Sequence, residues 1–445
     1  MERAHLVSTP GTGFRFWRWF LLRSAGFPFE RLEAITSPAL GEAADRALEA
    51  GAAFDAALKA AEAALAAFRA PSRQAWRELR DLFRGARDGA EVDPSGAPGE
   101  LRGPLAALAA SSRERHGAEA SYRAARSGEL DLSRARLREV FGDEALREAL
   151  LLQSRGGLRS VEHLPPVDAP RNHPVRRNEQ TAALHLQRCC AKNDTISFFG
   201  PIACGALGEG EGHVSLRPAE DLVLGRRTFF EHWAMRALAD ATSADPQVRP
   251  HLRPRRSPRV RLDGEALVHP VDRRSPLPPG WADLVARCDG ARTGQQLARE
   301  LAGGEAFPAE GEVLEALEEL REAGAVLWEV ELPTATAQPE RALRSELEKL
   351  PPGPGEPWLA KLDALESARA AFAEARGPGP RGEALEKLEV AFAAATGGSA
   401  TRGGGKFYEA RAAVYEDCVR GVRELRLGRG FLEKAGPALD LVLSS

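Results

Sequence analysis

The chain has 445 residues, of which 61 are basic and 64 acidic, and its formal net charge is −3. This length allows two or three domains with buried cores, and the near balance of charge neither favours nor disfavours a nucleic-acid partner, so only local basic clusters can decide. Five cysteines without C-x-x-C or histidine-paired spacing argue against a disulfide framework and a metal site, and they fit a reducing cytosol.

The first segments of the chain are an aromatic run and alanine-rich stretches. Arginines interrupt the run at residues 14–23, so it is neither a signal peptide nor long enough to span a bilayer. We interpret it as a core-packing strand or helix, with an interfacial amphipathic helix as the alternative. Residues 40–70 and 130–153 carry apolar side chains at helical spacing and predict scaffold helices. No later run approaches membrane-spanning length, so we expect a cytoplasmic protein with no membrane partner.

Residues 260–332 have a clear order of elements. Two short apolar strands flank Asp263-Gly264, a typical hairpin turn. Three amphipathic helices follow, the second beginning at Thr293, and a strand that ends before Pro333 closes the segment. This order predicts a winged helix-turn-helix. Its second helix is nearly neutral and its third is acidic, which argues against a DNA partner.

The segment most indicative of chemistry begins at Arg188. On a continuous helix, Arg188 and Lys192 would share one face and could grip one anion together. Asp194, Thr195 and Ser197 then supply a carboxylate and two hydroxyls, beside glycines that allow a ligand close to the backbone. Such a set suits phosphate or carboxylate capture. The alternative is an ordinary helix end and turn with its aromatic pair in the core, which the residues alone favour slightly.

Three stretches, taken in chain order, resemble one family. The central one is similar to the signature of the lantibiotic (lanthipeptide) dehydratase family, N-terminal domain, in the branch with Lys-Asn-Asp-Thr and Phe-Gly-Pro: Arg188-x-x-x-Lys192-Asn193-Asp194-Thr195-x-Ser197-x-Phe199-Gly200-Pro201. An earlier stretch, Leu22-Arg23 to Pro28, is similar to the opening segment of that family. A later one, which contains Tyr415-Glu416-Asp417-Cys418, resembles a further block of the same branch. Three ordered matches are far more specific than any one of them.

The resemblance implies an enzyme that moves the glutamyl group of glutamyl-tRNA onto Ser or Thr hydroxyls of a ribosomally made precursor peptide. It implies no cofactor and no metal, with glutamyl-tRNA as the co-substrate. Members of the family eliminate glutamate in a separate domain, which we expect this chain to lack. A split enzyme with a separate elimination-domain protein, a degenerate paralogue and a truncated sequence are the three alternatives. The alternatives are a non-catalytic leader-binding partner of a split dehydratase, and a ligase that adds an amino acid from aminoacyl-tRNA to a peptide.

The resemblance also implies roles for particular residues. Arg23 matches the N-terminal functional arginine, and Arg188 matches the first arginine of the central motif. Lys192 occupies the position of the second arginine, and Asp194 or Thr195 stands near the family's threonine. These groups would hold the tRNA 3′ end and orient the ester carbonyl. Lysine keeps the charge but loses the bidentate fork of arginine.

Further residues are expected to bind substrates: Arg171, Arg176, Arg177, Ser197, Tyr415 and Asp417. The basic runs at residues 171–177 and 253–261 have two interpretations of equal weight, tRNA phosphate contacts or solvated loops. The winged-helix segment resembles a leader-peptide recognition element, in which a leader adds as a strand beside the wing and docks an apolar residue against a helix. A purely structural winged helix is the alternative.

These inferences predict a helix-rich α+β protein, a multi-lobed glutamylation domain with an embedded winged helix-turn-helix. We expect a dehydratase-like core at residues 1–250 and the winged helix at residues 255–335. Residues 336–445 are expected to be a helical continuation of the domain that stops short of its full length.

Overall fold

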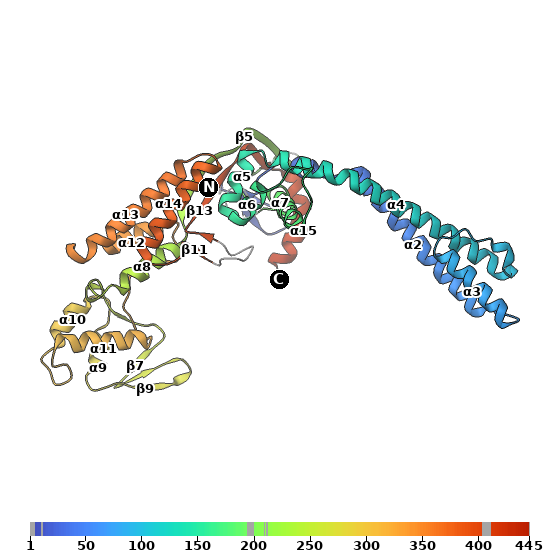
Figure 1. The fold of residues 1–445 in the computed structure, drawn as a ribbon. Coiled ribbons are helices and arrows are strands. Elements are labelled where there is room, and N and C mark those ends of the chain that lie inside the picture. The colour runs from blue at the N-terminus through green and yellow to red at the C-terminus, as the bar shows by residue number, and fades with distance from the viewer. Residues whose placement is uncertain are drawn as a thin grey trace. The chain divides into compact units, whose positions relative to one another are not determined.

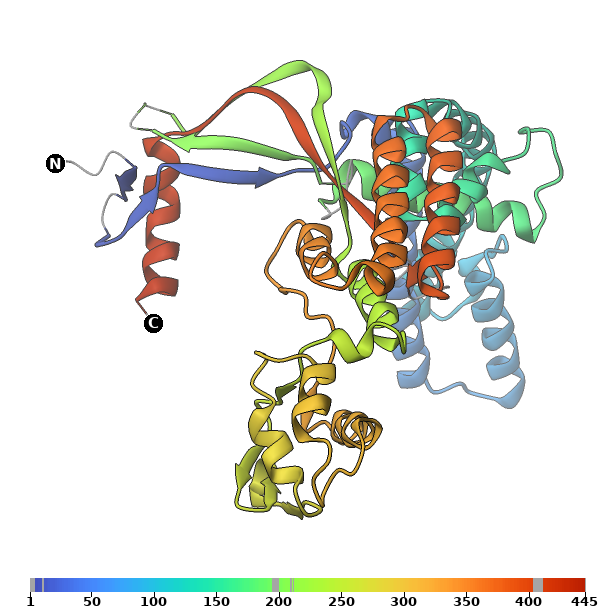
Figure 2. The same ribbon diagram turned by 90° about the vertical axis from the view of Figure 1, so that its left-hand side faces the viewer.

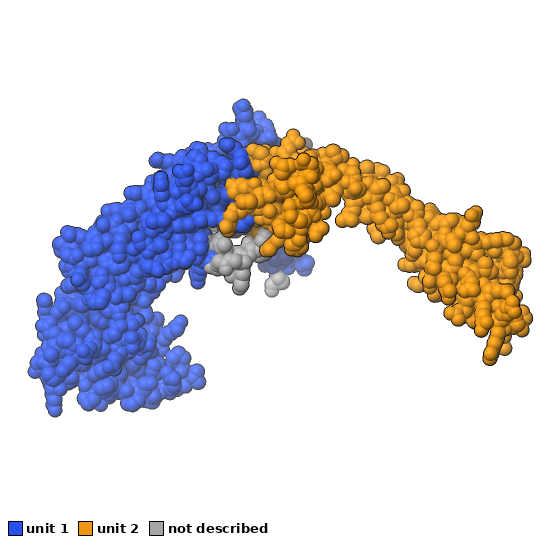
Figure 3. All heavy atoms as spheres, viewed as in Figure 1, with its two compact units in different colours: residues 1–27, 144–158, 191–445 blue, residues 28–143, 159–190 orange. Residues whose placement is uncertain are grey.

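The structure is a computed structural model, and it describes residues 5–9, 12–193, 200–208, 210, 212–402 and 411–444. The chain divides into two compact units, which Figure 3 colours separately. Unit 1 comprises residues 1–27, 144–158 and 191–445, and unit 2 comprises residues 28–143 and 159–190. Each unit is therefore assembled from separate stretches of chain. The subdivision expected from the sequence, with boundaries near residues 250 and 336, stays a prediction.

Unit 2 is built on three long helices that lie side by side in Figure 1: α2 (Pro38–Ala67), α3 (Arg73–Arg87) and α4 (Gly99–Val140). Ser37 and Ser72 begin the first two, because their side-chain oxygens accept hydrogen bonds from backbone N–H groups of the first turn. Apolar side chains of all three helices form one core that includes Phe54, Leu79 and Leu108. The predicted scaffold helix at residues 40–70 is confirmed. The unit also contains α1 (Glu30–Glu33) and most of α7 (His173–Ala191).

Unit 1 contains a four-stranded sheet in the order β3-β4-β13-β5. Its strands are β3 (Trp19–Arg23), β4 (Ile202–Leu207), β13 (Val414–Leu427) and β5 (Val214–Phe230). β4 and β13 run parallel, and the other neighbours are antiparallel. Figure 2 shows these strands extending to α15 (Arg429–Leu443), whose Leu432 packs with Val7 and Leu207 in a small core. A sheet beside long helices confirms the helix-rich α+β class.

The prediction that residues 336–445 continue as helix is wrong for β13. Helices do form at α12 (Pro339–Leu347), α13 (Pro352–Glu374) and α14 (Pro378–Thr396), and α15 follows the strand. From Val414 to Val419, however, burial alternates residue by residue, which is the period of a strand and not of a helix. Short strands β11 (Thr401–Arg402) and β12 (Arg411–Ala412) precede it. The alternation is between charged and apolar side chains on both faces, so hydrophobicity by itself does not reveal it.

The sheet has a packed face and an exposed face at its N-terminal strand. Phe20 packs inward with Leu432, and Gly205 of β4 is required there because a Cβ atom would lie 2.3 Å from the Phe20 ring and 2.8 Å from Leu425. Gly205 therefore makes room for packing, and not for a ligand as the sequence indicated. Outward-pointing Trp19 and Leu21 are 62% and 73% exposed. For these two side chains the core-packing interpretation of the aromatic run is wrong.

The elements predicted in the segment at residues 260–332 are present. β7 (Arg261–Asp263), β8 (Ala266–Val268) and β9 (Arg274–Pro276) form a three-stranded sheet with β8 in the centre. The helices α9 (Trp281–Arg287), α10 (Gly294–Leu301) and α11 (Glu310–Glu322) follow, and β10 (Val326–Leu327) returns to pair with β6 (Arg255–Arg256). Thr293 begins α10 with a capping box. The identity of this segment as a winged helix stays a prediction.

The remaining elements are β1 (Leu6–Ser8), β2 (Arg15–Trp17), α5 (Glu144–Gln153), α6 (Arg155–Glu162), α8 (His232–Ala244) and short 3₁₀ turns at η1 (Pro94–Gly96), η3 (Arg249–His251) and η4 (Pro270–Asp272). All five cysteines lie in described stretches and are free thiols, as expected, and only Cys204 is exposed. Across the described ranges, no helix is both long and apolar enough to cross a membrane.

Candidate functional site

The three stretches that carry the family resemblance meet at one rung of the sheet. Arg23, the last residue of β3, pairs with Ile202, the first residue of β4, and Ile202 pairs in turn with Val419 of β13. Directly paired residues of neighbouring strands point to the same side of a sheet, and residues two apart along a strand do so as well. Arg23, Val419, Asp417 and Tyr415 therefore share one side.

We call this side the open face and define it by Trp19, Leu21, Arg23, Ile202, Cys204, Tyr415, Asp417 and Val419. The burial pattern supports the assignment. Glu416 and Cys418, which point to the other side, are 1% exposed, whereas Val419 is 46% exposed and Tyr415 and Asp417 are half-buried. Three of the residues predicted from separate parts of the sequence, Arg23, Tyr415 and Asp417, thus lie on one accessible surface.

Arg23 is held by residues of the central motif. Its Nη1 donates a hydrogen bond to the Gly200 carbonyl oxygen at 2.9 Å, and its own carbonyl oxygen accepts one from Asn193 Nδ2 at 3.4 Å. The backbone N–H of Ser24 donates to the Pro201 carbonyl oxygen at 3.3 Å. The central motif therefore contacts Arg23 through Asn193 and Gly200. Its members Asp194, Thr195 and Ser197 lie outside the described residues, so their predicted roles stay predictions.

Arg420 supports the turn that follows Arg23. Its Nη1 donates hydrogen bonds to the carbonyl oxygens of Ala25 at 3.1 Å and Gly26 at 2.8 Å. The guanidinium is partly buried, and this burial lowers its pKa. The prediction of site residues missed Arg420, although it lies in the matched block beyond Cys418. Its partners are nearly 400 positions earlier in the chain, and only the fold reveals the contact.

Tyr415 and Asp417 have a defined local environment. The Tyr415 ring stacks on Phe229 of β5 with 5.3 Å between centroids. Burial, and then the carboxylates of Asp417, Glu231 and Glu340, raise the pKa of Tyr415, so its phenol stays protonated at neutral pH and can donate a hydrogen bond. Arg227 pairs with Asp417 across the sheet and adds an exposed guanidinium on the same side, which sequence reasoning also missed.

A buried ion cluster lies on the opposite side of the same strands. Arg381 of α14, which is 1% exposed, places Nη2 2.7 Å from Glu416 Oε1 and Nε 3.2 Å from Glu148 Oε1. Arg226 of β5 pairs with the same Glu148, and Thr228 donates to Glu416 at 3.2 Å. Two guanidinium groups and two carboxylates therefore connect α5, α14, β5 and β13 directly behind Tyr415 and Asp417.

The central motif contributes two basic residues at the C-terminal end of α7. The last residue of α7 is Ala191, so Lys192 directly follows the helix, and its predicted common face with Arg188 stays a prediction. Lys192 is exposed, and Arg188 is half-buried within α7. Burial and then the charge of Arg188 lower the pKa of the neighbouring buried His185 to about 4, so this histidine is neutral at physiological pH.

The predicted basic run at residues 171–177 divides into two parts. Arg171 donates from Nε to Glu179 Oε2 at 2.7 Å, and Arg134 donates to the other oxygen of this buried carboxylate at 2.6 Å. This pairing gives Arg171 a structural contact within unit 2. Arg176 and Arg177 lie in the first turns of α7 and are exposed, as phosphate contacts would need to be.

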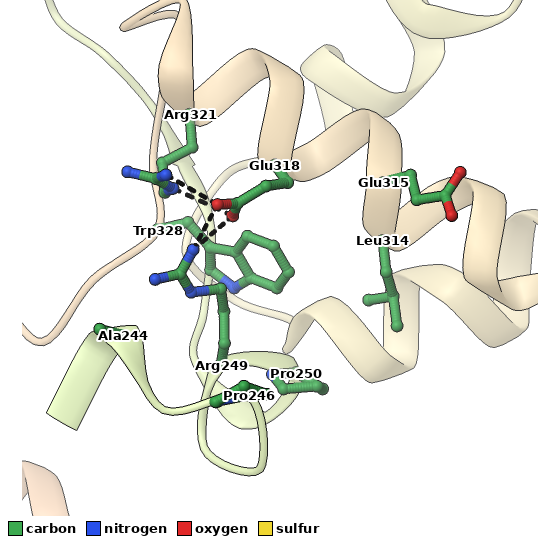
Figure 4. A pocket seen from close by; sticks show the side chains of 9 residues that line it. All are labelled: Ala244, Pro246, Arg249, Pro250, Leu314, Glu315, Glu318, Arg321 and Trp328. Carbon is green, nitrogen blue, oxygen red and sulfur yellow. Dashed lines mark hydrogen bonds and ion pairs between the residues drawn. The ribbon is translucent and has the colours of Figure 1, made fainter.

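A second candidate site is a cavity of about 500 Å³ beside α11, shown in Figure 4. Its lining residues are Ala244, Pro246, Arg249, Pro250, Leu314, Glu315, Glu318, Arg321 and Trp328. Glu318 Oε1 accepts hydrogen bonds from Arg249 Nη1 at 2.6 Å and Arg321 Nη2 at 2.7 Å, which neutralises its charge. Leu314, the prolines and the Trp328 ring supply apolar wall beside Glu315, so the cavity suits a side chain with an apolar body.

The Glu318 ion cluster predicts a measurable pH dependence. Hydrogen bonds from Arg321 and Arg249 hold the pKa of Glu318 at about 2. A lowered folded-state pKa gives stability that is present above the ordinary carboxyl pKa and is lost as pH falls towards 2. The side chain is about a third exposed, so we expect its ion pairs to contribute only about 1 kcal/mol to the free energy of unfolding. Glu318→Gln should therefore lower the unfolding midpoint at pH 7 but not at pH 2, as followed by circular dichroism. Exposed Glu319→Gln is the control, and equal losses at both pH values would contradict the prediction.

Across the described ranges, no group of three or more His, Cys, Asp or Glu side chains could hold a metal ion. The four-stranded sheet, with its long helices and the three matched stretches on one rung, defines an α+β domain of the dehydratase N-terminal type. The model of the family "Lantibiotic dehydratase, N terminus" matches residues 142–443. The chain belongs to this family, and the resemblance seen in the sequence is confirmed.

Two solved structures of one glutamylation domain agree on the fold. The glutamylation domain TbtB from thiomuracin biosynthesis is similar at a TM-score of 0.58 and 18% identity, over 95% of this chain and 51% of that one. The same values hold for that domain bound to 5′-phosphodesmethylglutamycin. The tRNA-dependent lantibiotic dehydratase MibB from Microbispora sp. 107891 is similar at a TM-score of 0.49 and 14% identity, over 68% of this chain and 29% of that one. The chain thus spans about half the length of the first relative. A search of curated proteins found no match.

Proposed function

We propose that this chain transfers the glutamyl group of glutamyl-tRNA to Ser or Thr hydroxyls of a ribosomally made precursor peptide. The observation that carries the proposal is that Arg23 and the Tyr415 block share the open face, and that Gly200 of the central motif holds Arg23 there. Membership of the dehydratase family and the fold of a glutamylation domain support it. A relative with a bound phospho-compound supports a phosphate-bearing ligand.

The reaction exchanges one ester for another. The peptide hydroxyl oxygen attacks the carbonyl carbon of the glutamyl ester, and a new carbon–oxygen bond forms. The bond to the terminal ribose oxygen of tRNA breaks, and that oxygen leaves with the proton of the attacking hydroxyl. Negative charge develops on the carbonyl oxygen, so a fixed cation beside it accelerates the step. Elimination of the added glutamate is a separate reaction and is not part of the proposed step.

The residues of the open face divide these tasks. Arg23 is oriented by Gly200 and presents a guanidinium that can bind the tRNA 3′ end or the carbonyl oxygen. Asp417 supplies a carboxylate for the ammonium group of the glutamyl residue, and protonated Tyr415 supplies a hydrogen-bond donor beside it. Arg188, Lys192, Asp194 and Thr195 keep the roles implied by the family resemblance. Because tRNA is the co-substrate, the reaction belongs in the cytoplasm.

Phosphate contacts by α7 give a prediction on salt dependence. If Arg176 and Arg177 each neutralise a tRNA phosphate, the double alanine variant should bind tRNA more weakly, with the slope of log K against log salt reduced by about 2. Filter binding at four salt concentrations measures this slope. Exposed Arg126→Ala on α4 is a control in the same unit. An unchanged slope in the double variant would show that neither Arg176 nor Arg177 contacts a tRNA phosphate.

The direct test is transfer of label from glutamyl-tRNA, charged with labelled glutamate, to a precursor peptide encoded nearby. We expect labelled ester on Ser or Thr with the wild-type chain and its loss in Arg188→Ala. Mass spectrometry locates the label. Label at the peptide C-terminus in an amide would instead establish the aminoacyl-tRNA ligase alternative. Exposed Arg429→Ala, on α15, controls for loss of an arginine as such.

A second candidate function is leader-peptide binding without catalysis. The three-stranded sheet leaves β7 and β9 as edges to which a leader strand could add, and the cavity beside α11 could take one apolar side chain. Fluorescence anisotropy with a labelled leader measures this interaction. Binding of the leader with no transfer in the presence of glutamyl-tRNA would favour a binding partner of a split dehydratase over an enzyme.

A further inference from the structure

One end of the open face is aromatic and unusually accessible. Trp19 and Leu21 precede Arg23 at intervals of two along β3, so the three side chains point to the same side, and the first two are 62% and 73% exposed. Cys204, which pairs with Leu21 on β4, is exposed beside them. Large apolar side chains grouped on a sheet surface indicate a binding site more often than scattered ones do.

We call the exposed side chains of Trp19 and Leu21 the strip, and the charge around it has one sign. Residues 3–29 contain four arginines and no aspartate or glutamate, in a chain whose net charge is −3. Arg15 and Arg18 are exposed and alternate in sequence with Trp17 and Trp19. Exposed aromatic rings interleaved with arginines are the composition that binds unpaired nucleotides, because bases stack on the rings and guanidinium groups neutralise phosphates.

The direction and length of the strip also fit a short run of unpaired nucleotides that ends at Arg23. Trp19 and Arg23 are four residues apart on an extended strand, a separation of about 13 Å. A strand of RNA whose terminal ribose lies at Arg23 would therefore place its preceding bases over Leu21 and Trp19. Beyond Arg23, the same face continues to Asp417 and Tyr415, where the proposed transfer takes place.

We propose that Trp19 and Leu21 form a stacking platform for the unpaired 3′-terminal nucleotides of the aminoacyl-tRNA, with Arg23 on the same face as the cation beside them. This inference rests on the proposed function and specifies which part of the tRNA the open face recognises. A protein or a membrane could also cover an apolar strip. Two features favour RNA, a polyanion whose bases can stack. The segment around the strip contains arginines and no acidic residues, and the strip continues along the sheet to Arg23.

Binding of deacylated tRNA, with and without its last three nucleotides, tests the platform. We expect Trp19→Ala to weaken binding of intact tRNA about tenfold, and Trp19→Phe to retain most of the affinity because a ring remains. The effect of Trp19→Ala should disappear with the trimmed tRNA. Val390→Ala, an equally exposed apolar position on α14, should bind both RNAs as the wild type does.

Cys204 provides an independent readout, because the other four cysteines are buried. Intact tRNA at about four times its dissociation constant should slow the modification of Cys204 by N-ethylmaleimide about fivefold, because only the unbound fraction reacts, and trimmed tRNA at the same concentration should not. Peptide mass spectrometry measures the rate. This measurement uses the wild-type chain, so it does not depend on the folding of a variant.

The outcomes separate the two proposals. If the wild type transfers glutamate and binds tRNA, but Trp19→Ala and the trimmed tRNA change nothing, the platform is wrong and the proposed function stands. If the wild type binds no tRNA and transfers no glutamate, both fail together. Loss of self-association or of binding to anionic vesicles in Trp19→Ala, with tRNA binding intact, would assign the strip to a protein or a lipid surface and overturn the inference.

Discussion

Arg23→Ala should lower the rate of glutamyl transfer by about 10²–10³-fold, the usual cost of removing one preorganised donor from a developing negative charge. The guanidinium sits where the three matched stretches meet, and Gly200 fixes its orientation through a 2.9 Å hydrogen bond. Single-turnover transfer from labelled glutamyl-tRNA measures the chemical step. The transfer rate of Arg23→Lys should lie between the rates of the wild type and Arg23→Ala, because lysine keeps the charge and loses the planar fork.

A structural explanation of the Arg23→Ala loss can be separated from a functional one. The hydrogen bond to Gly200 is partly buried and contributes about 1 kcal/mol to stability, so the unfolding midpoint should move by only a few degrees. Arg429→Ala, which removes an exposed arginine on α15, should transfer glutamate at the wild-type rate. Transfer by Arg23→Ala within threefold of the wild type would remove Arg23 from the site.

Arg381→Ala should lower the free energy of unfolding by about 3–5 kcal/mol, because it leaves the buried carboxylates of Glu148 and Glu416 without one of their two cations. The side chain also lies over the Phe372 ring at 4.1 Å, so its removal opens a cavity as well. Urea unfolding, followed by circular dichroism, measures the change. The large effect follows from burial, since Arg381 is 1% exposed.

A double-mutant cycle shows whether the charge is responsible. Arg381→Met keeps most of the volume, and adding Glu416→Gln removes the carboxylate left unpaired, so the double variant should be more stable than the sum of the single losses predicts. Arg429→Ala breaks an exposed pair with Glu433 and should cost at most about 1 kcal/mol. Additive losses at Arg381 and Glu416 would contradict a coupled cluster.

Local signals in the sequence predicted several elements correctly. The Asp263-Gly264 turn between short apolar runs predicted β7 and β8, and Thr293 predicted the start of α10, where the structure adds a capping box with Gln296. The alanine-rich periodicity gave α2. In each case the determining interactions lie within a few residues of one another, so a short window of sequence contains them.

Non-local elements were predicted less well. β13 was assigned to a helical continuation because its buried positions include Glu416, whose carboxylate forms an ion pair with Arg381 of a distant helix. A buried glutamate reads as a solvent-facing residue until its partner is known. Trp19 was assigned to the core for the converse reason, since its aromatic side chain is exposed on an uncovered face.

The sequence by itself determined the family, through three ordered motifs, and it named Arg23, Tyr415 and Asp417 as members of a site. Only the tertiary structure decided that these three share one side of a sheet, because strand register joins segments separated by hundreds of residues. It also placed Lys192 beyond the end of α7 and added Arg420 and Arg227. The chemistry of a side chain is a property of one residue and can be read from the sequence. Which side chains lie on the same side of a sheet depends on pairing between distant strands, which spacing in the sequence does not reveal.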